Sequence, residues 1–297
     1  NTSDLLYQVT LPSVTGYDSQ YQNIGAVRNR GWEITVSPDI IRTKDFKWTM
    51  DFNIAINKSK IKELYEGKSQ ISDNKIFEEG AEIDTWYMEE WAGVDIYTGD
   101  PMWYIYNEDG TRTLTNELSK ATRVKQGSSN PDFTGGIMTT FTYKDFSLSG
   151  AFSFVSGNKI YHSARQFYDN DGAYPTENTM KLKDGWSRWE KHGDIATHPK
   201  PIAGGNRDSQ KRSGRYLEDG SFFRMNTLTL SYTLPGNLLR KLGLKSGNVS
   251  LTGENLFTIT NFSGVDPEVG AGKDNGDPGT DFYPMTRQFS LGLNLSF

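Results

Sequence analysis

The feature that most constrains this chain is strict alternation of apolar and polar residues over unusually long runs. In the last run, "FSLGLNLSF" (289–297), Leu291, Leu293 and Leu295 share one face with Phe289 and Phe297, and small or polar residues share the other. Side chains of a strand alternate between two faces, so this period predicts strands with one apolar face. The same alternation recurs within 23–42, 46–63, 133–143, 146–162, 214–234 and 248–261.

Two architectures remove an apolar strand face from water. A soluble sandwich packs it into a core, and a transmembrane barrel turns it towards lipid. The alternating run 46–57 has about a dozen residues, as a tilted membrane strand needs, whereas ordinary strands have about 5–6. Short connections, 42–45 and 143–146, alternate with long ones, as in outer-membrane barrels. We therefore predict an all-β, antiparallel transmembrane β-barrel with long extracellular loops at 65–132, 164–213 and 262–284; a soluble all-β glycan-binding surface protein remains the alternative.

Aromatic residues include several close to the short connections, as an interfacial aromatic girdle requires. These several belong to a set that comprises Trp32, Phe46, Trp48, Tyr143, Phe146 and Tyr232. A mean hydropathy of −0.63 and the lack of a long apolar run exclude a helical membrane protein. A net charge of −5 argues against nucleic acid as a partner.

Seven strands and part of an eighth do not make a closed barrel with an even strand count. We therefore expect the C-terminal part of a larger barrel, beginning after any targeting segment and ending on the periplasmic side of a Gram-negative outer membrane. The long loop 65–132 is acidic, with 14 Asp or Glu and 6 Lys or Arg, whereas the short turns are rich in Lys and Arg.

The residues resemble a known family, the SusC/RagA-type TonB-dependent outer-membrane transporters. The matching stretches keep their order over nearly the whole chain. They are "NIGAVRNRGWEI" (23–34), "FKWTMDFNIAINKSKIKEL" (46–64), "WAGVDIYTGDPMWYIYNEDG" (91–110), "NPDFTGGIMTTFTYKDFSLSGAFSF" (130–154), "GRYLEDGSFFRMNTLTLSYTLP" (214–235), "LTGENLFTITNFSGVDPEVG" (251–270) and "YPMTRQFSLGLNLSF" (283–297).

The resemblance implies a 22-stranded barrel, of which this chain would supply the last 7–8 strands. It also implies a plug domain and a TonB box, neither of which lies in this chain. A SusD-like surface lipoprotein would close over the barrel, and TonB–ExbB–ExbD would act through the missing N-terminal part. The implied function is energised import of oligosaccharides or peptides, without enzyme activity. Phe297 resembles the terminal aromatic residue that the barrel-assembly machinery recognises.

Candidate substrate-binding residues lie in the aromatic-rich loop 65–132. Exposed rings would stack on sugars, although packing of the loop itself or of a partner protein is the more common use of such rings. The candidates are Trp86, Trp91, Trp103, Tyr104 and Tyr106. On the polar strand faces, the residues expected to face the lumen are Glu33, Asp51, Asn53, Arg224 and Glu254.

The sequence offers little for metal binding or catalysis. His192, Asp194 and His198 lack a convincing further ligand, so we expect no metal site there. Calcium in the outer loops is the one cofactor considered, because 266–281 holds acidic residues among glycines without EF-hand spacing. A glycoside hydrolase is disfavoured because no acid pair stands out among the carboxylates of 78–90.

Overall fold

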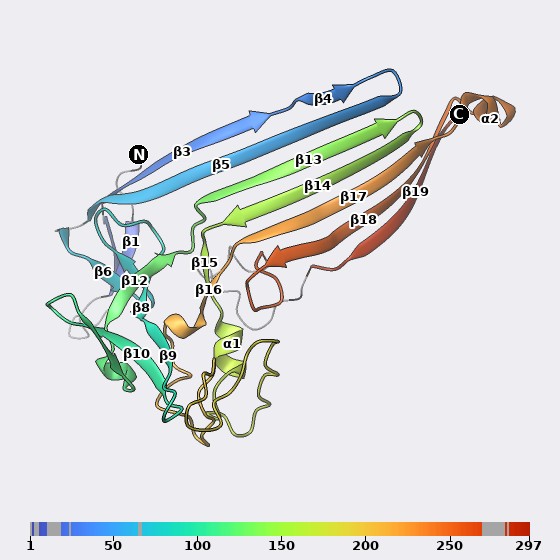
Figure 1. The fold of residues 1–297 in the computed structure, drawn as a ribbon. Helices are drawn as coiled ribbons and strands as arrows, with labels where there is room; N and C mark the ends of the chain where they lie inside the picture. Colours follow the sequence, from blue (N-terminus) through green and yellow to red (C-terminus); the bar gives the residue numbers. More distant parts are fainter. Residues whose placement is uncertain are drawn as a thin grey trace.

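The computed structural model describes residues 2, 6–10, 19–23, 25–64, 67–268, 283 and 285–297. Its dominant element is an eight-stranded antiparallel sheet with the order β19-β18-β17-β14-β13-β5-β3, in which β4 also pairs with β5 (Figure 1). The strands are β3 (Gly25–Val36), β4 (Asp39–Arg42), β5 (Phe46–Leu64), β13 (Phe133–Tyr143), β14 (Phe146–Ser156), β17 (Phe222–Thr233), β18 (Ser246–Thr260) and β19 (Gln288–Ser296).

Short connections lie at one end of this sheet and long ones at the other, as Figure 1 shows. The run 23–42 is broken into β3 and β4 because Pro38 lacks a backbone N–H, while its carbonyl still accepts from Met50 at 3.2 Å. The link between β17 and β18 carries the short helix α2 (Gly236–Lys241). In the described part of the chain, no helix is long and apolar enough to cross a membrane.

Rows of apolar side chains run across one face of the sheet because neighbouring strands pair with few register shifts. Near the short turns, Phe46, Tyr143, Phe146, Tyr232, Val249 and Leu293 are direct cross-strand neighbours. The next row contains Trp48, Phe141, Leu148, Leu230, Leu251 and Leu291. Leu291, for example, is 77% exposed. A soluble protein would cover an apolar face of this extent with a second layer.

The apolar band has the height of a membrane. Trp32, which is 75% exposed, lies opposite Ile56, far from the short turns. About ten residues of β5 separate Phe46 from Ile56, which at about 3.3 Å per residue and a tilt of about 45° gives roughly 23 Å. The outer apolar band of such barrels is about 25 Å tall. Trp32 therefore marks the edge of the band opposite the short turns.

Polar rows cover the other face. Thr140 and Ser149 hydroxyls lie 3.0 Å apart, and the Thr229 and Thr252 hydroxyls repeat this distance. The full row comprises Thr49, Thr140, Ser149, Thr229, Thr252 and Ser290. One face is therefore apolar and the other hydroxyl-rich, as the alternation predicts.

The long connections fold into a body of small sheets beyond one end of the large sheet (Figure 1). They contain a four-stranded and a three-stranded sheet, with a core formed by Trp86, Met88, Tyr161 and Tyr216. The elements are β6 (Gln70–Ser72), β7 (Lys75–Phe77), β8 (Thr85–Glu89), β9 (Trp91–Val94), β10 (Pro101–Tyr106), β11 (Arg112–Thr115), η3 (Leu118–Lys120), β12 (Arg123–Ser128), β15 (Lys159–Tyr161), α1 (Ser163–Tyr168), η4 (Gly214–Tyr216) and β16 (Leu217–Asp219). A separate hairpin pairs β1 (Leu6–Thr10) with β2 (Ser19–Asn23).

Candidate functional site

The five residues expected to face the lumen fall on one face of the sheet. Asn53 and Arg224 belong to one cross-strand row, Asp51 and Glu254 to the next, and Glu33 pairs with Ala55 on the same face. Arg224 reaches this face only because Asn226 is an extra residue in β17, where the pairing with β14 shifts register. The register thus brings all five together on the polar face, and their contact with a barrel lumen stays a prediction.

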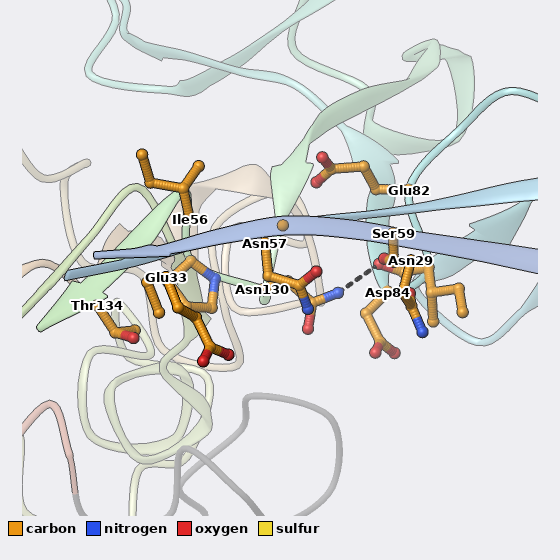
Figure 2. Close-up of a pocket in the computed structure, with 13 residues that line it drawn as sticks. Asn29, Glu33, Ile56, Asn57, Ser59, Glu82, Asp84, Asn130 and Thr134 are labelled. Carbon is orange, nitrogen blue, oxygen red and sulfur yellow. Dashed lines mark hydrogen bonds between the residues drawn. The ribbon is translucent and has the colours of Figure 1, made fainter. Parts of the chain in front are cut away.

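A cleft of about 880 Å³ opens at the long-connection end of the polar face. The sheet supplies Asn29, Gly31, Glu33, Ala55, Ile56, Asn57, Ser59 and Thr134, and the loop body supplies Glu82, Ile83, Asp84, Asn130 and Pro131. Figure 2 shows Glu33, Asn57 and Asp84 on one side of the strand ribbon and Ile56 on the other.

The loop side of the cleft is fixed by internal hydrogen bonds. The Asn130 side-chain amide donates to the Ile83 carbonyl at 2.8 Å. Lys75 Nζ donates to Asp84 at 3.0 Å and to the Ser129 hydroxyl at 2.9 Å. Burial lowers the pKa of Lys75, and the Asp84 charge opposes that shift. The Asp84 carboxylate is therefore already engaged by a cation.

The chemistry of the cleft is hydrogen bonding. Its lining contains three side-chain amides and three carboxylates, but no aromatic ring among the thirteen residues. Amides both donate and accept, and carboxylates accept. The cleft can therefore bind hydroxyl groups or peptide amides, and none of the thirteen described lining residues offers a ring on which a sugar could stack.

The five candidate aromatic residues differ in burial: Trp86 and Trp103 are buried, Trp91 and Tyr104 are half-buried, and Tyr106 is exposed. Trp86 is 3% exposed and donates from Nε1 to the Lys159 carbonyl at 3.0 Å. Trp103 is fully buried, with its ring edge-on to Trp91 at 5.6 Å between centroids. In this structure these three rings pack the loop body, which is the alternative that the sequence left open.

Tyr104 and Tyr106 lie at the surface of the β10–β11 hairpin. Their rings are 6.5 Å apart, and the Arg112 guanidinium lies 4.7 Å from the Tyr104 ring. The Tyr106 hydroxyl donates to Glu90, which raises the pKa of Tyr106. A ligand role for Tyr104 and Tyr106 stays a prediction.

A buried ionic cluster in the loop body was not found by sequence reasoning. Asp169 and Asp171 are both fully buried, and both accept hydrogen bonds from Arg188 and Arg215. His198 Nε2 lies 2.8 Å from the Asp169 carboxylate. Its contacts join residues that are 17 to 46 positions apart in the sequence, so no local spacing could have revealed it.

Electrostatics stabilise the charged form of the buried acids. Burial raises the pKa of Asp169, but the hydrogen bond from His198 and the Arg215 charge outweigh it and bring that pKa to about 2. Burial also raises the pKa of Glu218, which the hydrogen bond from His162 and the Arg165 charge lower to about 2. These acids hold the outer connections together by charge pairing.

The candidate metal ligands are occupied by protein partners. Asp194 accepts from the backbone N–H groups of Glu190 and Lys191, and His192 packs against the Tyr97 ring. Among the described residues, no group of three or more His, Asp or Glu side chains is placed to hold a metal ion. Of the calcium candidates, Asp266 and Glu268 contact Arg224 at 2.5 and 3.0 Å, and Asp274, Asp277 and Asp281 lie outside the described residues.

The long antiparallel strands and the bilayer-high apolar band define a part of a transmembrane β-barrel of the outer-membrane type. No family model matches the chain. Individual proteins do match it over its whole length. TonB-dependent receptor P3 of Formosa agariphila is 31% identical, and TonB-dependent receptor SusC of Bacteroides thetaiotaomicron is 27% identical.

Solved structures give the same result. The structure of the RagAB peptide transporter matches with a TM-score of 0.84 and 30% identity, covering 99% of this chain and 32% of that one. The "open-open" state of the RagAB peptide importer matches with a TM-score of 0.81. The predicted resemblance to SusC/RagA-type TonB-dependent receptors and the predicted fold class are therefore confirmed. The chain spans about a third of the length of these relatives.

Proposed function

We propose that the full-length protein imports oligosaccharides or peptides across the outer membrane of a Gram-negative bacterium. The observation that carries this proposal is the match of the whole chain to receptors and to a peptide importer, combined with a membrane-high apolar band on the sheet. The relatives are receptors and transporters, so we propose that this protein makes or breaks no bond in its cargo.

The same comparison supports a proposal for the partners. We propose that a SusD-like lipoprotein covers the long connections and that TonB–ExbB–ExbD energises opening through parts of the protein outside this chain. Assembly in the membrane would use the barrel-assembly machinery. The loop body stands beyond the membrane band on the side that such a lid would cover.

The cleft beside Glu33 is the surface of this chain that we propose contacts the cargo on its way through the lumen. Its amides and carboxylates suit a polar, uncharged or cationic chain of sugars or amino acids. The absence of aromatic rings in the lining favours the peptide among the two cargo classes.

The test is uptake by cells that carry the full-length protein. A deletion strain should lose uptake of a defined set of fluorescent oligosaccharides or peptides, and a strain lacking TonB should lose the same set. Replacing Glu33 by Gln together with Asn57 by Ala should reduce uptake while leaving the amount of assembled protein unchanged. Glu117→Gln, on the exposed surface of the loop body, is the matched control.

Two results would contradict the proposal. One is unchanged uptake of every probe in the deletion strain. The other is recovery of the protein in the aqueous phase without detergent as a folded monomer, which would favour the soluble glycan-binding alternative.

A further inference from the structure

Four cationic side chains form a ladder on the apolar, membrane-facing side of β3 and β5. Arg30 lies directly opposite Lys58, and Arg28 directly opposite Lys60. They share the face of Trp32 and Ile34, because residues two apart on a strand point the same way. We call these four residues the cationic ladder.

The ladder places like charges where a sheet normally avoids them. Like charges directly opposite each other on paired strands are destabilising. Within the described residues, Asp132 is the one carboxylate that forms an ion pair with any of the four, at 3.2 Å from Lys58 Nζ. Both members of that pair are more than half exposed, so it contributes little. Among the described residues, the two successive like-charged pairs are therefore opposed by this one exposed carboxylate.

The depth of the ladder matches a lipid headgroup layer. It begins two residues beyond Trp32 and Ile56, where the apolar band ends. On tilted strands, two residues rise by about 5 Å and four by about 10 Å. The headgroup and interfacial regions add roughly 5–7 Å on each side of the hydrocarbon. Because the ladder lies at the long-connection end, it faces the outer leaflet.

We propose that the cationic ladder binds the phosphate groups of a phosphorylated glycolipid in the outer leaflet. Two guanidinium groups offer paired donors that match phosphate oxygens, and two ammonium groups add point charge. Four cations spread over two strands can neutralise two phosphates. The ladder therefore suits a headgroup that carries two phosphates better than a phospholipid that carries one.

The experiment titrates lipids into the detergent-purified full-length protein and follows the bound species by native mass spectrometry. The probes are diphosphorylated lipid A, monophosphorylated lipid A and phosphatidylglycerol. The wild type should bind them in that order of affinity. The ladder variant carries four substitutions, Arg28→Gln, Arg30→Gln, Lys58→Gln and Lys60→Gln. We expect each lost cation to weaken the binding of diphosphorylated lipid A by about five-fold.

A matched control removes four cations at the opposite end, by Lys44→Gln, Lys144→Gln, Arg240→Gln and Lys241→Gln. It should bind lipid A as the wild type does. Thermal unfolding supplies a second readout. Without lipid, the ladder variant should melt at or above the wild-type temperature because repulsion is relieved. Adding lipid A should stabilise the wild type more than the variant.

Three results would overturn the proposal. The first is equal affinity of the wild type and the ladder variant for diphosphorylated lipid A. The second is an equal loss of affinity in the control variant, which would indicate a general charge effect. The third is full competition by 10 mM inorganic phosphate, which would indicate a site for free anions rather than for a lipid.

Discussion

At the scale of single residues, buried charges connect the barrel wall to the outer connections. Arg224 is 1% exposed and holds Asp266 at 2.5 Å and Glu268 at 3.0 Å. The carboxylate of Asp266 also accepts from the Glu268 backbone N–H at 2.9 Å. One cation of the polar face thereby anchors the start of the connection that follows β18.

Replacing Asp266 by Ala should destabilise this anchor by about 3–5 kcal/mol, because it leaves a buried guanidinium without its main partner. We expect faster amide hydrogen exchange in residues 260–268. Glu117→Gln breaks the exposed pair with Lys120 and should change stability by less than about 1 kcal/mol. Equal exchange in the two variants would contradict a structural role for the Arg224 pair.

The acid cluster predicts a pH dependence with a definite sign. The pKa values of Asp169 and Glu218 are both lowered to about 2 in the folded protein, from ordinary values of 3.8 and 4.5. Their contribution to stability is therefore present above about pH 4.5 and is lost as the pH falls towards 2. Each carboxylate should contribute on the order of 2 kcal/mol. Limited proteolysis within residues 160–220 should become faster as the pH falls from 5 to 3, while β13 and β14 stay protected. Equal protection of both regions at pH 3 would contradict a stabilising role of the buried acids.

At the scale of elements, register determines which face each side chain occupies. From Leu228 onward, the even-numbered residues of β17 lie on the apolar face of the sheet. Before Asn226, the odd-numbered residues Phe223 and Met225 lie on that face instead. The bulge at Asn226 makes this switch, and with it Arg224 turns to the polar face. An uninterrupted strand would instead have turned a guanidinium towards lipid.

Leu293→Arg tests the face assignment of β19. Leu293 lies opposite Val249 on the apolar face, so the change should cost about 2–4 kcal/mol if it sits near the bilayer midplane, and less near the interface. Asn294→Arg, on the polar face opposite Asn248, should cost much less. The measurement is the fraction of full-length protein that assembles in membranes. Equal assembly of both variants would reverse our assignment.

Gly135 in β13 leaves room for the aromatic ring of Phe154. A Cβ at Gly135 would lie 2.4 Å from the Phe154 ring and 2.4 Å from the Asn53 carbonyl. Gly135→Ala should therefore cost about 1–3 kcal/mol through displaced packing. The same substitution at Gly236 meets nothing within 4 Å and should be neutral or mildly stabilising. Denaturation of both variants in detergent provides the comparison, and equal stability would show that Phe154 can move at no cost.

At the scale of the whole molecule, the sheet of the described residues ends with β3 on one side, where Thr2 alone bridges to Val27, and with β19 on the other. In a membrane, unpaired backbone groups are costly, and a closed barrel removes them. The relatives are about three times as long as this chain. Closure of the barrel by further strands is therefore the arrangement that the edges require.

We propose that Phe297 serves as an assembly signal in the full-length protein. It follows β19 directly and is 80% exposed. Its deletion should lower the amount of protein assembled in the outer membrane, while the cargo affinity of each assembled molecule stays unchanged. Phe289→Ala, on the same face of β19, controls for loss of apolar surface. Normal assembly after the deletion would remove the signal hypothesis.

Local features of the sequence, among them the alternation of residues such as Leu291, Gly292 and Leu293, determined the fold class. A period of two, a run longer than ordinary strands and alternating connection lengths are all local properties, so they can be read from order alone. The resemblance to SusC/RagA-type receptors was likewise visible in the order of short stretches.

Only the tertiary structure decided what the loop residues contact. Trp86 and Trp103 look like ligand-binding rings in the sequence but are buried in the loop body, and Asp169, His198 and Arg215 meet across long separations. The bulge at Asn226 and the opposed cations of β3 and β5 follow from strand register. Register and burial depend on pairing between distant segments, and no local pattern carries that information.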